Sequence, residues 1–278
     1  MMSQIQRKTI EELMRSKFGK ELIGLAATIY ALTKYRKICY ISYDGAWVHR
    51  YLGETIVDSA INFNGGSGLN DAISESWFYR YKPKYGDTII DVGAGIGTDT
   101  FLFSKMVGPL GKVIAIEAHP RTFACLSKMC RYNNLSNVIL YNCAITDKKT
   151  DVFIDDSSVH ISNTIMNQKS GFKVDGISLD ELLIKCKVGH IDFLKMNIEG
   201  AERLAIRGMK KTLRITDFVC IACHDFLDKR EGVESVKTKS IISDFLEKNG
   251  FEVILRNQDE RDWVRDHVHG RAQKLKKK

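Results

Sequence analysis

The sequence predicts an α/β fold in which a mostly parallel sheet of seven strands is doubly wound, with helices on both faces. Short apolar runs rich in β-branched residues alternate with helical segments from residue 88 to residue 255. The first of these runs leads directly into a glycine-rich turn. The chain has 278 residues, of which 44% are hydrophobic and 27% charged, and this composition suits a globular domain with a sizeable core.

The N-terminal residues 1–70 are predicted to form an extension of that domain. Apolar side chains recur at helical spacing over residues 5–33, which indicates an amphipathic helix that packs on the body or serves as a lid or dimer helix. Two short β-like runs, Tyr40–Tyr43 and Ala46–Tyr51, flank Asp44-Gly45. This pattern is typical of a β-hairpin.

The main domain is predicted to span residues 71–270. Its strands are expected at Thr88–Val92, Lys112–Glu117, Val138–Ala144, Ile191–Asn197, Asp217–His224 and Phe251–Leu255, with a final antiparallel strand at Trp263–His269. Its helices are expected near residues 71–81, 98–107, 120–133, 178–185, 200–213 and 236–248. A polar insertion at about 150–177, with strand-like pieces at Val152–Ile154 and Phe172–Val174, is expected near the mouth of the sheet.

The formal net charge of +8 first suggests a polyanionic partner. Residues 1–37, however, carry eight Lys and Arg against three Asp and Glu, and residues 261–278 carry seven against two. The body between them is therefore slightly acidic. The excess belongs to the N-terminal helix and to a basic tail at residues 271–278, so nucleic acid is not the expected partner.

The seven cysteines show no spacing typical of a disulfide framework, and the sequence has neither a signal peptide nor a run long enough to span a membrane. We therefore expect a reducing, cytoplasmic location. Cys220 and Cys223 form a lone CxxC in an apolar strand, where residues three apart point to opposite faces. We interpret both as small core residues.

The segment from Thr88 to Thr98 is the most informative part of the sequence. A strand that ends in Asp91 and Val92 enters the turn Gly93-Ala94-Gly95-Ile96-Gly97, and a helix follows. Glycines let the backbone approach a ligand, and the helix N-terminus adds unpaired N–H groups. A dinucleotide-binding turn would need a glycine at Thr98. The next strand ends in Glu117, an acid that can accept both hydroxyls of a ribose.

This turn, D-x-G-x-G-x-G with an acid after the second strand, resembles that of the class I S-adenosylmethionine (SAM) methyltransferases. The resemblance implies SAM as cofactor and a Rossmann-like class I sheet. The third strand ends in Asn142, which can hydrogen-bond the adenine edge, and small Ala144 leaves room for the base. The residues expected to bind the cofactor are Asp91, Gly93, Ala94, Gly95, Gly97, Glu117, Asn142 and Ala144. A nicotinamide or flavin enzyme, or a glycine turn without ligand, are the alternatives.

Three motifs together resemble the FkbM family of methyltransferases. They are G-D-x-x-x-D-V-G-A-x-x-G at Gly86–Gly97, S-L-D-E-L at Ser178–Leu182, and K-x-N-x-E-G-A-E at Lys195–Glu202. The likeness covers about residues 75–255. It implies O-methylation of a small hydroxylated acceptor of the sugar, lipid-linked or natural-product type. Independently of the family, Ser178 has the position of a helix N-cap, with Glu181 completing a capping box.

The sequence departs from the family pattern at two acids. Asn197 replaces an Asp, and the fifth strand ends Ala222-Cys223-His224 where an E-x-H is usual. Fewer carboxylates argue against a divalent metal, so we expect none. We expect His224 and Glu199 to be the candidates for a general base, since His titrates near neutral pH. Asn197, an amide that cannot take a proton, completes the predicted catalytic set.

Other residues and other functions remain open from the sequence. Lys195 is interpreted as structural or charge-pairing, His160 as a possible acceptor contact in the insertion, and His267 with His269 as strand residues rather than a metal pair. A nucleic-acid methyltransferase is a second function, although no N-P-P-Y-like segment follows the fourth strand. A SAM-binding protein without catalysis is a third. A homodimer formed through the N-terminal helix is the expected assembly.

Overall fold

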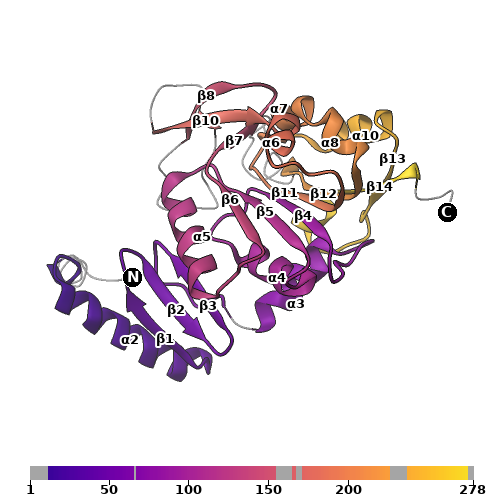
Figure 1. The fold of residues 1–278 in the computed structure, drawn as a ribbon. Coiled ribbons are helices and arrows are strands. Elements are labelled where there is room, and N and C mark those ends of the chain that lie inside the picture. The colour runs from indigo at the N-terminus through magenta and orange to yellow at the C-terminus, as the bar shows by residue number, and fades with distance from the viewer. Residues whose placement is uncertain (1–11, 66, 155–164, 167–170, 226–236, 275–278) are drawn as a thin grey trace.

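The computed structural model of the chain describes residues 12–65, 67–154, 165–166, 171–225 and 237–274. His160 and the tail beyond Lys274 lie outside these ranges. The chain forms a large α/β body and an N-terminal extension that lies at one side of it (Figure 1). Among the described residues, no helix is both long and apolar enough to cross a membrane.

The body contains the predicted seven-stranded sheet, in the order β13-β14-β12-β11-β4-β5-β6. Strand β14 is antiparallel to both of its neighbours, and the other pairings are parallel. The strand order reverses between β4 and β11, so their carboxyl ends border the crevice where ligands bind in such sheets. The strands are β4 (Thr88–Val92), β5 (Lys112–Ile116), β6 (Val138–Tyr141), β11 (Ile191–Met196), β12 (Thr216–Ala222), β13 (Phe251–Leu255) and β14 (His267–Ala272).

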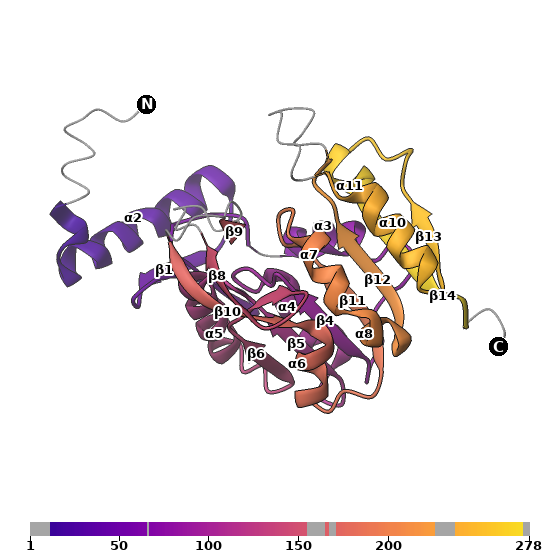
Figure 2. The ribbon, with the colours of Figure 1, turned by 90° about the horizontal axis from the view of Figure 1, so that it is seen from above.

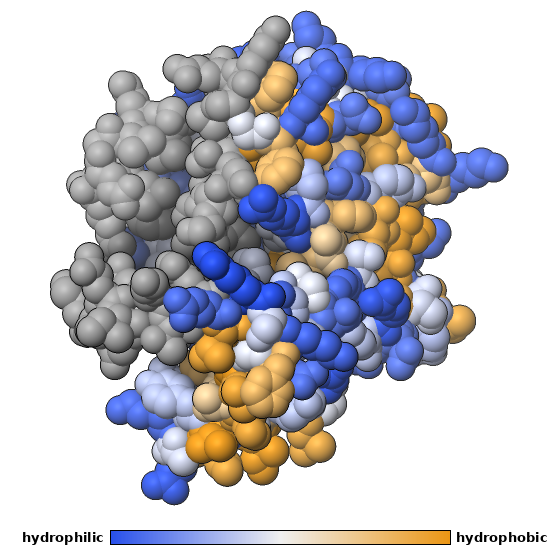
Figure 3. Space-filling view, turned by 90° about the vertical axis from the view of Figure 1, so that its left-hand side faces the viewer, coloured by the Kyte–Doolittle hydropathy of each residue, from blue (hydrophilic) through white to orange (hydrophobic). Residues whose placement is uncertain are grey.

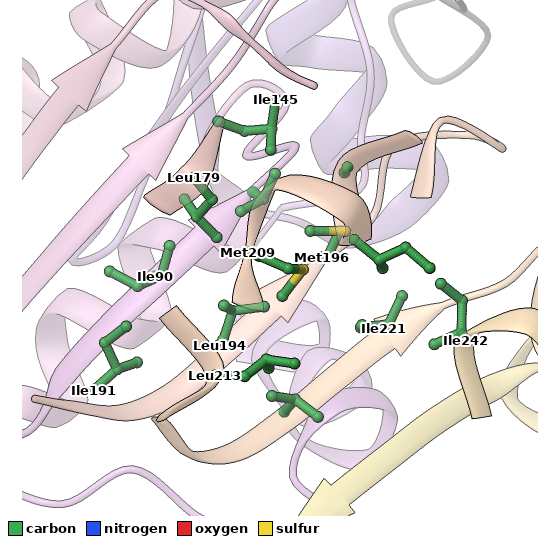
Figure 4. Close-up of a cluster of buried hydrophobic side chains, with 14 of the residues drawn as sticks. Ile90, Ile145, Leu179, Ile191, Leu194, Met196, Met209, Leu213, Ile221 and Ile242 are labelled. Carbon is green, nitrogen blue, oxygen red and sulfur yellow. The ribbon is translucent and has the colours of Figure 1, made fainter. Parts of the chain in front are cut away.

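Helices cover both faces of this sheet. On one face lie α3 (Ser67–Trp77), α4 (Thr98–Val107) and α5 (Pro120–Tyr132), and on the other α6 (Leu179–Lys185), α7 (Glu202–Ala205), α8 (Lys210–Arg214) and α10 (Lys239–Lys248). Figure 2 shows α10 along β13 and β14. Figure 4 shows the core of the second face, where fully buried side chains such as Leu194 and Leu179 meet. Burying one such side chain contributes about 1.5–3 kcal/mol.

The predicted strand at Val138–Ala144 is wrong at its end. Strand β6 stops at Tyr141, and Ala144–Thr146 forms β7 in a second sheet of order β7-β10-β8-β9. Asn142 causes the break, because its Nδ2 donates to the carbonyl oxygens of Glu117 and Ala118 and holds the chain there. The other strands of the second sheet are β8 (Thr150–Ile154), β9 (Ile165–Met166) and β10 (Phe172–Ser178), so the strand-like pieces expected in the insertion are confirmed.

Two further elements differ from the expectation. The helix expected over residues 200–213 is divided into α7, a 3-10 turn at Ile206–Gly208 and α8. A Cβ on Gly208 would lie 2.5 Å from the carbonyl oxygen of Thr146, so the chain turns here to pack closely on β7. Trp263 lies in the short helix α11 (Asp262–Arg265) rather than in the final strand, which begins at His267 and continues to Ala272. That strand therefore takes up the first two residues of the segment expected to be tail.

The extension consists of α2 (Lys17–Tyr35) and an antiparallel sheet of β1 (Cys39–Tyr43), β2 (Trp47–Tyr51) and β3 (Glu54–Asp58). The hairpin around Asp44-Gly45 is confirmed, and β3 is an additional strand. The predicted helix is interrupted before α2, where Ser16 caps it by accepting a hydrogen bond from Gly19 N. The sheet lies between α2 and α5, and the side chain of Asn133 pairs with both backbone groups of Thr55.

Candidate active site

A buried lysine holds the glycine-rich turn in place. Lys195, on β11, is 1% exposed. Its Nζ donates to Asp91 Oδ1 at 2.9 Å and to Gly93 O at 2.8 Å, and lies 3.2 Å from Asp99 Oδ2. Thr100 Oγ1 donates to the other Asp91 oxygen at 2.6 Å. The turn and the first residues of α4 are thus clamped to β11, and the charge-pairing role expected for Lys195 is confirmed. Asp91 uses both of its oxygens inside the protein.

The three glycines of the turn differ in what surrounds them. Gly93, Gly95 and Gly97 have φ values of 73°, 58° and 97°, a region that strains any residue with a Cβ. A Cβ on Gly93 would lie 1.9 Å from Asn197 O, and one on Gly97 would lie 2.2 Å from Met129 Cε. A Cβ on Gly95 would meet nothing within 4 Å. Packing requires Gly93 and Gly97, whereas Gly95 borders open space.

Glu117 faces the turn from the end of β5. Its Oε2 accepts a hydrogen bond from Gly95 N at 2.9 Å, and its Oε1 accepts one from His119 N at 2.8 Å. Burial raises the pKa of this carboxyl, although the two amides act in the opposite direction. Because Glu117 Oε2 accepts a hydrogen bond from Gly95 N, the carboxyl group lies directly beside the open space at Gly95. Ala94 is 5% exposed, and its N–H donates to Ile116 O.

Asn142 and Ala144 lie on different sides of the break between the two sheets. Asn142 joins the site indirectly, because its Nδ2 holds the backbone of Glu117 and Ala118 at 2.9 and 3.0 Å. Ala144 is 2% exposed and packs in the small core of the second sheet. The structure thus brings Asn142 to the end of β5 and encloses Ala144 among aliphatic side chains.

A second polar cluster lies where β11 and β12 end. His224 Nε2 lies 3.3 Å from Glu199 Oε2, and His224 Nδ1 lies 3.9 Å from Glu202 Oε1. Glu202 Oε1 also accepts a hydrogen bond from Ile198 N at 3.1 Å. Glu199 has φ 52° and Gly200 has φ 94°. Two successive left-handed residues turn the chain sharply after β11, which sets the Glu199 carboxyl against the imidazole.

Burial sets the protonation of this cluster. It raises the pKa of Glu199 and of Glu202 to about 7 and lowers the pKa of His224 to about 4. The imidazole is therefore neutral at neutral pH, and both carboxyl groups keep their protons to a higher pH than exposed carboxyl groups do. Groups with a pKa near the working pH are suited to proton transfer.

A cavity of about 260 Å³ opens beside the second cluster. Its wall includes Asn197 and His224, and the buried Asn197 Oδ1 has no hydrogen-bond partner among the described residues. Helices α3 and α11 and the last strand complete the lining, which comprises Ala72, Ile73, Ser76, Trp77, Asn197, Ala222, Cys223, His224, Trp263 and His267. Apolar and aromatic groups with a few polar atoms at one end are typical of a small-molecule site.

Sequence reasoning missed several of these residues. The walls Trp77 and Trp263 come from a predicted helix and a predicted strand far from the motifs, and only the fold brings them together. Asp99 and Glu202 belong to the motif regions, but the motifs alone assign them no role. The sequence contains a signal for Glu202, because an acid that follows a strand and faces an apolar helix is costly to bury without a partner.

The structure has the features that SAM requires. Gly95 borders open space, and the Glu117 carboxyl, which accepts a hydrogen bond from Gly95 N, lies beside it. Gly93, in the same turn, packs against the backbone of Asn197, so the turn lies next to the cluster that contains Asn197 and His224. The fold and the site together define a class I SAM-dependent methyltransferase.

The comparison with protein families names the group more closely. The Methyltransferase FkbM domain matches residues 91–253, and the chain belongs to this family. Hexuronic acid methyltransferase AglP from Haloferax volcanii is 26% identical over 188 residues, which cover 67% of this chain and 71% of that protein. The resemblance seen in the sequence is confirmed.

Two solved structures are similar to the chain. The methyltransferase FkbM from Methylobacillus flagellatus has a TM-score of 0.44 and 17% identity, covering 69% of this chain and 45% of that one. A SAM-dependent methyltransferase from Aquifex aeolicus has a TM-score of 0.44 and 17% identity, covering 74% and 92%. The chain thus spans less than half of the solved FkbM structure.

Proposed function

We propose that this methyltransferase transfers a methyl group to a hydroxyl of a small acceptor of the sugar type, and that the cavity beside His224 holds the acceptor. The observation that carries the proposal is the position of that cavity. It is lined by Asn197 and His224 at the ends of two adjacent strands, next to the turn that Lys195 clamps. An acceptor there would lie close to the end of the glycine turn.

On the cofactor side, we propose two kinds of residue. Gly95 and Glu117 border the open space and would contact SAM, with the Glu117 carboxylate accepting the ribose hydroxyls. The remaining predicted residues would act by shaping the turn and the strand ends around it: Asp91, Gly93, Ala94, Gly97, Asn142 and Ala144. When bound, SAM supplies a methyl group on a positively charged sulfur, which a hydroxyl oxygen displaces.

The acceptor hydroxyl must lose a proton during that displacement. We assign the proton to the pair formed by His224 and Glu199, in which Nε2 lies 3.3 Å from Oε2. His224 lines the cavity and is neutral, so it can take the proton, and the Glu199 carboxylate stabilises the imidazolium that results. The short distance between Nε2 and Oε2 lets the pair act as one base in the proposal.

Asn197, which also lines the cavity, supports the same assignment. Its buried Oδ1 has no hydrogen-bond partner among the described residues, and an unpaired buried acceptor costs about 1–3 kcal/mol. A donor on a bound molecule would remove that cost. We propose that Asn197 orients the acceptor or the cofactor through this oxygen, since an amide cannot take the proton itself.

The cavity wall also indicates the charge of the acceptor. The ten described residues that line it include two tryptophans and no Lys or Arg. A carboxylate on the acceptor would find no cation among them, whereas the apolar face of a neutral sugar packs well on an indole. The relative from Haloferax volcanii is named for a hexuronic acid. For this chain we propose an uncharged sugar ring.

The test is methyl transfer from labelled SAM to a matched panel that contains a neutral hexose glycoside and the corresponding hexuronic acid. We expect transfer to the neutral sugar and weaker transfer to the acid. His224→Ala should abolish transfer and leave SAM binding unchanged, as measured by isothermal titration calorimetry. His190→Ala is the control, because His190 lies at the opposite end of β11. SAM binding with no transfer to any acceptor would instead favour a binding protein without catalysis.

We also propose that the chain pairs with a second copy through α2. Phe18, Leu22, Leu25, Ile29 and Leu32 are 41–69% exposed and follow one another at steps of 4, 3, 4 and 3 residues. This is the spacing of a seam between two helices. Figure 3 shows the side of the molecule that lies at the left in Figure 1, and hydrophobic side chains gather on its lower part, where the extension lies.

We also propose a reducing, cytoplasmic location. The seven free cysteines are consistent with it.

The dimer is tested by sedimentation of wild type and of Leu25→Glu. We expect the wild type to sediment as a dimer and the variant as a monomer that still binds SAM. Leu110→Glu is the control, since Leu110 is 78% exposed on the main domain, outside α2. A monomeric wild type that binds anionic vesicles through α2 would contradict the dimer and point to a membrane surface.

A further inference from the structure

Three buried side chains that have no part in the proton transfer proposed above meet on one face of the sheet, and one of them, His267, also lines the cavity. Cys220 on β12 is paired directly with His269 on β14, and His267 lies two residues before His269 on the same face. Their exposed fractions are 0%, 3% and 4%. A thiol and two imidazoles are costly to bury together unless they find partners.

The geometry of the three groups is that of a slightly expanded metal site. One potential ligand atom from each residue lies within 4.8 Å of the others, and Cys220 Sγ lies 3.9 Å from His269 Nε2. Zn²⁺ binds thiolate sulfur at about 2.3 Å and imidazole nitrogen at about 2.0–2.1 Å, which sets tetrahedral ligand atoms about 3.3–3.6 Å apart. The side chains therefore need to approach by roughly 1 Å, which small changes of side-chain rotation supply.

The surroundings orient one of the ligands. His267 Nδ1 lies 3.3 Å from Ser76 O, so a proton on Nδ1 can be donated to that carbonyl and Nε2 keeps a free lone pair. Trp77 stacks on the His267 ring at 4.7 Å, with 5° between the planes. A backbone carbonyl behind a histidine is the usual arrangement around a bound metal, because it fixes the ring and its tautomer. The nearby Lys195 is already paired with two carboxylates, which offset its charge.

We propose that Cys220, His267 and His269 bind Zn²⁺, with a small ligand such as water in the fourth position. Binding forms one Zn–S and two Zn–N bonds, and the Cys220 thiol releases its proton to solvent. Thiolate and imidazole donors in a buried setting match zinc better than magnesium or calcium, which prefer oxygen. The ion would tie β14 to β12 and fix His267, which forms part of the cavity wall.

Cys223, directly after the end of β12, provides a matched control. It packs with the cluster of buried residues on the opposite face of the sheet from Cys220, as the spacing in the sequence predicts. A second group of residues, His190, Asp192 and Asp217, also brings potential ligands together, but it is partly exposed and mostly acidic. The His190→Ala variant therefore distinguishes weak metal binding at this second group from metal binding at the buried site.

The experiment titrates chelator-treated protein with Zn²⁺ alone and repeats the titration with Co²⁺. We expect one ion per chain, and with Co²⁺ the near-ultraviolet absorption of a cobalt–thiolate bond. Cys220→Ala and His269→Gln should each remove both signals, whereas Cys223→Ala and His190→Ala should keep them. If either of the first two variants fails to fold by circular dichroism, the other still decides. Unchanged binding by both, or loss only in His190→Ala, would overturn the proposal.

Discussion

The two polar clusters at the ends of the strands differ in how their charges are balanced. At the glycine turn, Lys195 contacts the carboxylates of Asp91 and Asp99. Burial acts against the ammonium charge, but these two acids raise the pKa of Lys195 above its usual value. At the end of β12, Glu199 and Glu202 face a neutral His224. The comparison teaches that the first cluster, called compensated below because it contains its own cation, holds the backbone. The second, called uncompensated because Glu199, Glu202 and His224 include no Lys or Arg, has carboxyl groups that can exchange protons.

The largest expected effect comes from breaking the compensated cluster. Lys195→Met leaves the buried Asp91 and the partly buried Asp99 without their cation, and losing one member of a buried ion pair costs about 3–5 kcal/mol of the free energy of unfolding. The measurement is urea denaturation of wild type and variant. Adding Asp91→Asn to Lys195→Met should recover part of the loss, because it removes one of the uncompensated charges. A loss below about 1 kcal/mol in the single variant would contradict a compensated cluster.

Breaking the other cluster should affect rate rather than stability. His224→Ala is expected to lower kcat by about 10²–10⁴-fold, the usual contribution of a general base. The free energy of unfolding should fall much less than in Lys195→Met. Single-turnover transfer from labelled SAM measures the effect. If His224→Ala transfers methyl groups as fast as His190→Ala, the assignment of the proton to this pair is wrong.

Two glycines of the turn sharpen the comparison, because Gly97 packs against buried side chains and Gly95 borders open space. Gly97→Ala should destabilise the fold by about 1–3 kcal/mol through the overlap of the new methyl group with Met129, in addition to backbone strain of about 1–2 kcal/mol. Gly95→Ala adds only backbone strain of about 1–2 kcal/mol but fills the open space, so it should weaken SAM binding more than Gly97→Ala does. Calorimetric titration and thermal unfolding of both variants check this. The reverse pattern would place the cofactor elsewhere.

The pH dependence is the smallest effect and tests the uncompensated carboxyl groups. The base form of Glu199, whose pKa burial raises to about 7, increases with pH, so kcat/KM should rise through pH 7 and level off above it. For Glu202, whose folded pKa is also raised to about 7, the stability contribution is complete below the unfolded pKa and is lost as pH rises through 7. Wild type should therefore lose stability relative to Glu202→Gln between pH 5 and pH 8. A constant difference would rule this out.

Much of the sheet could be predicted because its signals are local. The strand at Thr88–Val92 and the helix at residues 98–107 have the predicted bounds, since apolar residues and glycines mark both. Ser178 caps α6 by accepting a hydrogen bond from Glu181 N, but the Glu181 carboxylate pairs with Lys185 instead of completing the box. Local patterns therefore predict helix α6 correctly, but only one of the two hydrogen bonds of its capping box.

The remaining features depend on contacts between distant segments. The break at Asn142 follows from its hydrogen bonds to the end of β5. Trp263 lies in a short helix, and in the loop before that helix Arg261 forms an ion pair with Asp259. The cavity needs α3, α11 and two strand ends at once. No pattern within a short window could specify these positions, because each is set by tertiary packing.

The position of β14 has a consequence for how the chain becomes folded. This strand is inserted between β12 and β13, although both of them precede it in the sequence. Until residues 267–272 have been synthesised, β12 has an open edge and β13 has no partner in the sheet. A growing chain on the ribosome would therefore expose two unpaired strand edges, which are prone to aggregation, until its last strand emerges.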